Sequence, residues 1–299
     1  MACTECPKSS ADAAARQRHP YNPKPSPHFP PEQGAEVVQN AGLAVRVVDN
    51  RTQTLLPPRE SCRVTDWYAV SMPGTRSTLS DWQPAKLPQP VALYGRTVLL
   101  EPLDAELHAA ALWDSVQGHD AVWQWLFDGP FDTESAFTAN IEAKQAASDR
   151  IFYALISAEI GAAAGYASFL RMEPAHGVIE VGNILLSPVL QRTTAATEAM
   201  YLMARHVFED LGYRRYEWKC NALNAPSRRA AQRLGFTFEG IFRQHMVVKG
   251  HSRDTAWFAM LDHEWPARKA AFETWLDPSN FDAAGRERTS LSAGSHPAL

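Results

Sequence analysis

The segment from Leu186 to Ala199 has the residue types of a site for a phosphate-bearing ligand. An apolar run ends at Ser187-Pro188, a short loop of small and polar residues follows, and a long amphipathic helix then begins. Backbone N–H groups of such a loop, together with the positive end of the helix, bind pyrophosphate readily. An ordinary helix N-terminus has the same pattern, so the spacing by itself leaves both interpretations open.

Positive charge is concentrated around this segment, although the chain as a whole is acidic. The formal net charge is -4, from 29 Lys and Arg against 33 Asp and Glu. Between Arg192 and Asp254, eleven Lys or Arg stand against six Asp or Glu, a local excess of five positive charges. This excess favours a polyanionic ligand, and a solvated charged face is the alternative. The total charge points to neither nucleic acid nor an anionic membrane as a partner.

Composition divides the chain of 299 residues into four parts. Residues 1–35 are rich in Pro and Ser and predict a disordered tail, and 36–90 predict an extension of unknown role interrupted by prolines. The main domain spans 91–265, and 266–299 predict a C-terminal helix and a flexible tail. No signal peptide or membrane-spanning stretch is recognisable, which makes the cytoplasm the default location. Four cysteines are too few for a disulfide framework, and no metal site is expected.

The elements that would position the loop can be read from Val91 onwards. Apolar runs and alternation predict strands over 97–101, 151–157, 165–171, 177–186, 215–220, 236–249 and 255–261. Caps and periodicity predict helices over 104–117, 132–147, 226–234 and 264–276, and a further helix after the loop that Gly212 ends. Strands and helices are interleaved without strict alternation. The predicted class is therefore α/β (α+β), with a mixed sheet and helices on both faces.

Three motifs in order resemble those of the GNAT superfamily of N-acetyltransferases. Gln191, Thr194 and Ala196 occupy the places of its signature, Gln or Arg, two residues, Gly, one residue, then Gly or Ala. Asn224-Ala225-Pro226-Ser227 and Arg233-Leu234-Gly235-Phe236 resemble its Asn-x-x-Ser and Leu-Gly-Phe patterns, and the run Ala196–Ala199 is similar to that of the RimJ/RimL branch. Thr194 departs from the family signature, which has Gly at this place. A β-branched residue does not adopt the positive φ angle that Gly allows.

The resemblance implies a GNAT fold, with a mostly antiparallel sheet, and acetyl-CoA as the acyl donor. The strand at 178–186 would splay from the strand at 215–220, and the pantetheine arm would lie in the gap. The implied contacts of CoA are with Asn183, Ile184, Leu185 and Leu186 on the strand, with Gln191, Arg192, Thr193, Thr194, Ala195, Ala196 and Thr197 in the loop and helix, and with Asn224, Ser227 and Arg228 beyond. Main-chain N–H groups near the thioester would polarise its carbonyl.

Catalysis, on the same resemblance, would fall to Glu180 and Ser227. Glu180 would remove a proton from the acceptor ammonium, and Ser227 would donate a hydrogen bond or proton to the CoA thiolate. The alternatives are a strand carboxylate paired with an arginine and a helix cap. Attack on the bound thioester would be direct, and Cys220 alternates with Tyr216 and Trp218 as a core residue.

The acceptor would be a primary amine, either a peptide or protein N-terminal α-amine or a small molecule. Trp123, Trp125 and Phe127 would form an aromatic wall of its groove, or else pack in the core under a loop, and His245 would flank the groove. A non-catalytic, CoA-binding regulatory module on the same fold is the alternative function. The protein is expected to be a monomer or a homodimer.

Overall fold

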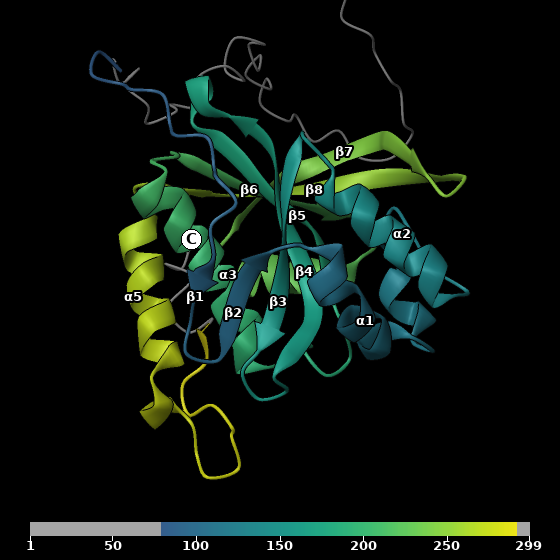
Figure 1. Cartoon of the computed structure of the whole chain (residues 1–299). Coiled ribbons are helices and arrows are strands. Elements are labelled where there is room, and N and C mark those ends of the chain that lie inside the picture. Colours follow the sequence, from purple (N-terminus) through teal and green to yellow (C-terminus); the bar gives the residue numbers. More distant parts are fainter. Residues whose placement is uncertain (1–78, 292–299) are drawn as a thin grey trace, which may run out of the picture. The chain divides into compact units, whose positions relative to one another are not determined.

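The computed structural model describes residues 79–291. The predicted tail at 1–35, most of the predicted extension at 36–90, and residues 292–299 lie outside the described residues. Figure 1 shows the described part as a central sheet with helices packed against it.

The sheet has eight strands in the order β1-β2-β3-β4-β5-β6-β8-β7. Their bounds are β1 Leu93–Tyr94, β2 Val98–Pro102, β3 Arg150–Ser157, β4 Ala162–Glu173, β5 Val178–Leu186, β6 Arg215–Asn221, β7 Thr237–Val248 and β8 His251–Leu261. Neighbouring strands pair antiparallel except β5 and β6, which run parallel. The predicted mixed, mostly antiparallel sheet is confirmed.

Five α-helices of the described part begin where the sequence offers a start signal. They are α1 Ala105–Val116, α2 Glu134–Gln145, α3 Thr194–Arg205, α4 Ala225–Arg233 and α5 Trp265–Leu276. Asp104, Thr133, Thr193 and Asn224 cap the first four, each side chain accepting the N–H group three residues on. A π-helical turn, His206–Asp210, continues α3 to Gly212, whose φ angle of 76° ends it.

Helices cover the sheet on two faces because β3 is apolar on both. Phe152 and Ala154 pack with residues of α1 and α2, whereas Tyr153 and Leu155 pack with α3. In Figure 1, α1 and α2 lie on one side of the strands, and α3 and α5 lie on the other. The two apolar clusters sandwich the sheet, which fixes the strands that carry the site.

A β-bulge in β5 changes the face that its side chains occupy. Ser168 of β4 pairs with Gly182, but Tyr166 pairs with Leu185, so β5 has one extra residue here. The extra residue, Asn183, has a φ angle of 50°, and its Nδ2 donates to Ser168 Oγ at 2.9 Å. Asn tolerates this left-handed conformation better than most residues. Val181 therefore packs with α3, while Leu185 packs on the opposite face.

Both ends of the described part pack onto the domain. Ala85, in the predicted extension, is buried, and its N–H donates to the Pro174 carbonyl. After α5, where the sequence predicted a flexible tail, Asn280 and Leu291 are instead buried. The Asn280 amide donates to the carbonyls of Trp275 and Thr289, which ties this segment to the end of α5. Within the described range, no helix combines the length and the apolar character needed to cross a membrane.

Candidate active site

Two cavities lie at the point where β5 and β6 separate. Val178–Val181 pair with Arg215–Trp218, and the ladder stops at Gly182. Ile184 and Trp218 line both cavities, so the two spaces adjoin through the gap between the strands. One cavity contains Glu180 and is called the Glu180 cavity, and the other contains Arg233 and is called the Arg233 cavity. The predicted splay of the strands is confirmed, and two chemically different spaces adjoin at it.

The loop before α3 lines the Arg233 cavity and presents helix N–H groups to it. Its left-handed residue is Arg192, with a φ angle of 62°, rather than Thr194. Thr193 caps the helix by accepting the Ala196 N–H at 3.1 Å, and Thr194 is the first helical residue. Thr194 therefore needs no positive φ, which removes the difficulty that its β-branched side chain raised. The N–H groups of Thr194 and Ala195 have no acceptor in residues 79–291, as expected for an anion site at a helix start.

Arg192 and Arg233 are the cations that line this cavity, and Arg228 does not line it. Arg233 lies in the last turn of α4, just before the Leu-Gly-Phe motif, and its Nη1 donates to Thr197 Oγ1 at 3.1 Å. Glu287, from the segment after α5, lies 3.7 Å from its Nη2. Arg228 is turned away and donates to the Ala222 carbonyl. Sequence spacing missed Arg233 because nothing in it shows which face of so short a helix meets α3.

The other predicted contacts of CoA are divided between the cavities and the core. Leu186 and Ile184 line the Arg233 cavity, but the side chain of Leu185 is buried on the opposite face. Gln191 donates from Nε2 to the Leu186 carbonyl at 2.9 Å and so holds the loop against the end of β5. Asn183 lines the Glu180 cavity.

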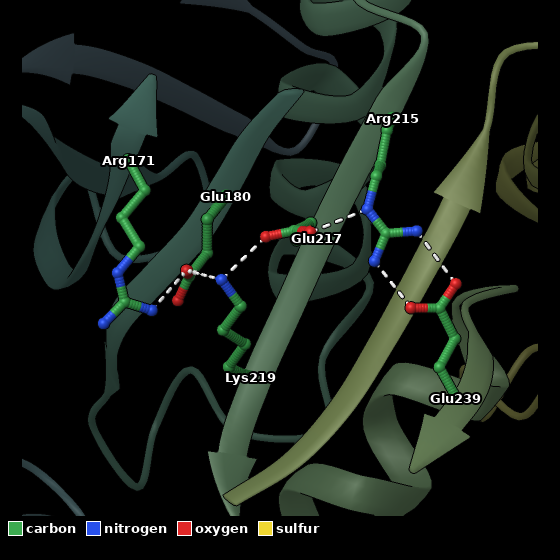
Figure 2. Close-up of polar contacts among 6 residues, drawn as sticks. All are labelled: Arg171, Glu180, Arg215, Glu217, Lys219 and Glu239. Carbon is green, nitrogen blue, oxygen red and sulfur yellow. Dashed lines mark hydrogen bonds and ion pairs between the residues drawn. The ribbon is translucent and has the colours of Figure 1, made fainter. Parts of the chain in front are cut away.

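A chain of alternating charges, buried at its centre and exposed at both ends, carries Glu180 (Figure 2). Glu180 is 4% exposed, and its Oε2 atom lies 2.8 Å from both Arg171 Nη1 and Lys219 Nζ. Lys219 also contacts Glu217 at 2.7 Å. Glu217 and Lys219 alternate with the core residue Trp218, yet their face of the strand is covered too, and both side chains are buried. Glu180 is therefore held in one position by two cations.

Further along the chain of charges, Glu217 meets Arg215, which in turn binds Glu239 on β7 (Figure 2). The hydrogen bonds that Arg215 donates to Glu239 and then to Glu217 raise the pKa of Arg215 despite its partial burial. The pKa of Glu239 is lowered, because it accepts the hydrogen bonds of Arg215. The network therefore runs from the cavity toward the edge of the sheet.

Ser227 and Asn224 line the Glu180 cavity from the start of α4. Trp218 Nε1 donates to Ser227 Oγ at 3.0 Å, so Ser227 accepts in this contact and keeps its own hydroxyl proton, and the Cys220 side chain is a further hydrogen-bond partner of Ser227. Asn224 uses its Oδ1 atom to cap the helix at the Ser227 N–H. Burial raises the pKa of the neighbouring Cys220 thiol, which fits a core residue rather than a nucleophile.

The structure separates the three aromatic residues that are expected to line the acceptor groove. Trp125 and Phe127 line the Glu180 cavity, whereas Trp123 is 2% exposed and packs edge-on against Phe131 and Phe137 in the core. His245 also lines the cavity, and its Nδ1 lies 3.0 Å from Thr255 Oγ1. Burial and the charges of Arg171, Arg253 and Lys219 lower the pKa of His245. These cations give the cavity a positive potential.

Comparison with known proteins agrees with this arrangement. The family model described as an acetyltransferase (GNAT) domain matches residues 97–237. A GCN5-related N-acetyltransferase from Brucella melitensis is 46% identical, over 72% of this chain and 98% of that one, with a TM-score of 0.71. The chain belongs to the GNAT acetyltransferase family. Its members are acyltransferases that use acetyl-CoA as cosubstrate, and the two cavities with their helix start and Arg233 fit a nucleotide-bearing thioester.

Two other solved structures are less similar to this chain in sequence and in fold. A probable GNAT-family acetyltransferase from Chromobacterium violaceum is 43% identical, over 65% of this chain and 98% of that one, with a TM-score of 0.61. RimL, an α-N-acetyltransferase of ribosomal protein L7/L12, is 22% identical, over 59% and 99% of the two chains, with a TM-score of 0.50. At that identity the likeness shows the shared fold alone. No curated protein sequence matches the chain.

Proposed function

We propose that this GNAT protein transfers an acetyl group from acetyl-CoA directly to a primary amine, with Glu180 and Ser227 as its catalytic residues. The observation that carries the proposal is that Glu180 and Ser227, from different elements, line one cavity beside the gap between β5 and β6. A thioester reaching through this gap from the Arg233 cavity would meet an acid–base pair on arrival.

The proposed reaction releases one proton and transfers another. Glu180 takes a proton from the acceptor ammonium, and the free amine attacks the thioester carbonyl carbon. Unpaired main-chain groups of β5 beyond Val181 would stabilise the oxyanion. The C–S bond then breaks, the second amine proton leaves, and the thiolate sulfur gains a proton with the help of the Ser227 hydroxyl. Glu180 returns its proton to solvent through water, so the products are the N-acetylated amine, CoA thiol and one proton.

The proposed acceptor is a primary amine, either the N-terminal α-amine of a peptide or protein or a small amine. The run Ala196–Ala199 supports a relation to the RimJ/RimL branch. The half-buried Trp125 and exposed Phe127 give the cavity an apolar wall that suits the carbon skeleton of such an acceptor.

Two carboxylates of the same network make a matched test. Glu180→Gln and Glu217→Gln each remove a partner of Lys219, but only Glu180 lines the cavity. We expect Glu180→Gln to lower kcat for thiol release by roughly 100-fold or more, within the range of a lost general base. The dissociation constant of acetyl-CoA should stay unchanged in both variants, and Glu217→Gln should keep most of the activity.

Equal losses in the two variants would show that Glu180 acts only through the network. Acetyl-CoA binding without thiol release on any amine, in the wild-type protein, would favour the alternative, a non-catalytic CoA-binding regulatory module. The contacts of Glu180 with two cations support this alternative, because a carboxylate with a purely structural role would have the same partners.

A further inference from the structure

One charged side chain of the Glu180 cavity is not used by the proposed reaction. Arg253, on β8, is 7% exposed, and its Nε atom has no hydrogen-bond partner. Within residues 79–291 its guanidinium makes no ion pair or hydrogen bond, and its one ring contact is with Phe127, at 5.1 Å from the ring centroid. A buried charge without a partner is costly, so such a group indicates a ligand that brings the opposite charge.

Strand register places Arg253 on the same face of the sheet as the charged network. Lys219 of β6 lies opposite Trp257 of β8, and Asn221 lies opposite Thr255. Directly opposed residues share a face, and so do alternate residues of one strand. Arg253 therefore projects from the same face as Lys219, into the cavity that Glu180 lines.

The charges around the cavity do not balance. Three cations line it, Arg171, Lys219 and Arg253, and Glu180 is its one carboxylate among the described residues. The buried network that includes Arg171 and Lys219 is neutral, because its three cations are paired with three carboxylates, and this leaves Arg253 as the unmatched charge. One negative charge on a ligand would complete the set. A phosphate monoester would bring about 1.5 to 2 charges, so a single carboxylate fits this count better.

We infer that the acceptor amine carries a carboxylate, and that Arg253 binds this group while Glu180 faces the amine. This inference rests on the proposed function and names its substrate class, an amino-acid-like acceptor. A guanidinium matches a carboxylate with two parallel hydrogen bonds, and the ring of Phe127 covers the other side of the Arg253 group. The cavity, about 170 Å³, holds a small acceptor of this kind.

The kinetic test compares each free amino acid with its own amide, for example phenylalanine with phenylalaninamide. Thiol release from acetyl-CoA is measured, with rates compared per unprotonated amine. We expect the wild-type kcat/KM to be at least about 10-fold higher for the acids, as for a charge-assisted hydrogen bond. Arg253→Gln should bring this ratio close to one, mainly through KM, and leave the rate on the amides and the affinity for acetyl-CoA unchanged. Arg253→Lys should keep part of the preference.

Stability provides a control for the folding of the variant. Replacing an unpaired buried cation by a neutral side chain should leave the melting temperature equal to or above that of the wild type. A wild-type enzyme that acetylates amides as fast as acids would overturn the inference. So would an equal loss on both substrates in Arg253→Gln, because Arg253 would then act on the thioester or the thiolate.

A binding experiment separates this inference from the proposed function. In calorimetry, 3-phenylpropanoate, which lacks the amine, should bind the wild-type protein and lose at least about 10-fold in affinity for Arg253→Gln. If no amine releases thiol but this difference remains, the acyl transfer is wrong and the anion site stands. If 3-phenylpropanoate binds both proteins equally, the anion site is wrong even if amines are acetylated.

Discussion

Removing Lys219 tests whether the buried network holds the site together. Lys219 is about 5% exposed and lies within 2.8 Å of Glu180 and 2.7 Å of Glu217. Its Nζ atom also lies 3.9 Å from the centroid of the Trp257 ring. In Lys219→Met the two carboxylates would remain buried without the cation between them. Removing one partner of a buried ion pair costs about 3–5 kcal/mol, because the other charge stays uncompensated.

The expected loss in the free energy of unfolding is at the lower end of this range, because each carboxylate keeps an arginine partner. Arg171 still binds Glu180, and Arg215 still binds Glu217. A loss of about 3 kcal/mol lowers the melting temperature of a domain of this size by roughly 6–12 °C. Thermal unfolding followed by circular dichroism measures the change directly. Adding Glu217→Gln to Lys219→Met removes one of the two facing carboxylates and should recover part of the loss.

Lys269→Met is the matched control for this experiment. Lys269 also lies near two carboxylates, those of Glu209 and Glu273, but at the surface. Exposed ion pairs contribute little to stability, so this variant should melt close to the wild type. If Lys219→Met also melts within about 2 °C of the wild type, the buried network contributes no more than a surface pair. Lys219 would then not be the group that holds Glu180 in position.

Two further predictions concern the Arg233 cavity and His245. Arg233→Gln should weaken acetyl-CoA binding roughly 10- to 100-fold, the value of a charge-assisted hydrogen bond to phosphate. Arg229→Gln, exposed on the same helix, should change the affinity less than about 2-fold, and equal effects in calorimetry would contradict the assignment. NMR titration should give His245 a pKa below its usual 6.5, and Arg253→Gln should raise it, because Arg253 is one of the charges that lower it. The folded protein binds the imidazole proton of His245 less tightly than the unfolded chain does. The contribution of His245 to stability is therefore present above pH 6.5 and is lost as the pH falls through the folded-state pKa. His245→Asn should therefore show a smaller fall in melting temperature between pH 7.5 and 5.5, and an unchanged fall would contradict the lowered pKa.

Local sequence signals predicted most elements of the fold. Caps predicted the helices at 104–117 and 226–234, and periodicity predicted the helix that ends at Gly212. These signals act over three or four residues, through a cap or one helical face, so their neighbours in the chain suffice. The gap between β5 and β6 was expected from the family resemblance and not from residue patterns.

The side-chain arrangement of the site depended on contacts between elements distant in the chain. Alternation showed which residues of β6 share a face, but the burial of Glu217 and Lys219 follows from β5, β8 and the covering loop around Phe127. The bulge at Asn183 reversed the expected alternation within β5. A strand's own sequence reports its period of two, whereas burial and charge pairing depend on what packs against each face. The sequence by itself therefore determined the elements and the order of the motifs, and the tertiary structure alone decided that Glu180, Ser227 and Arg253 line one cavity.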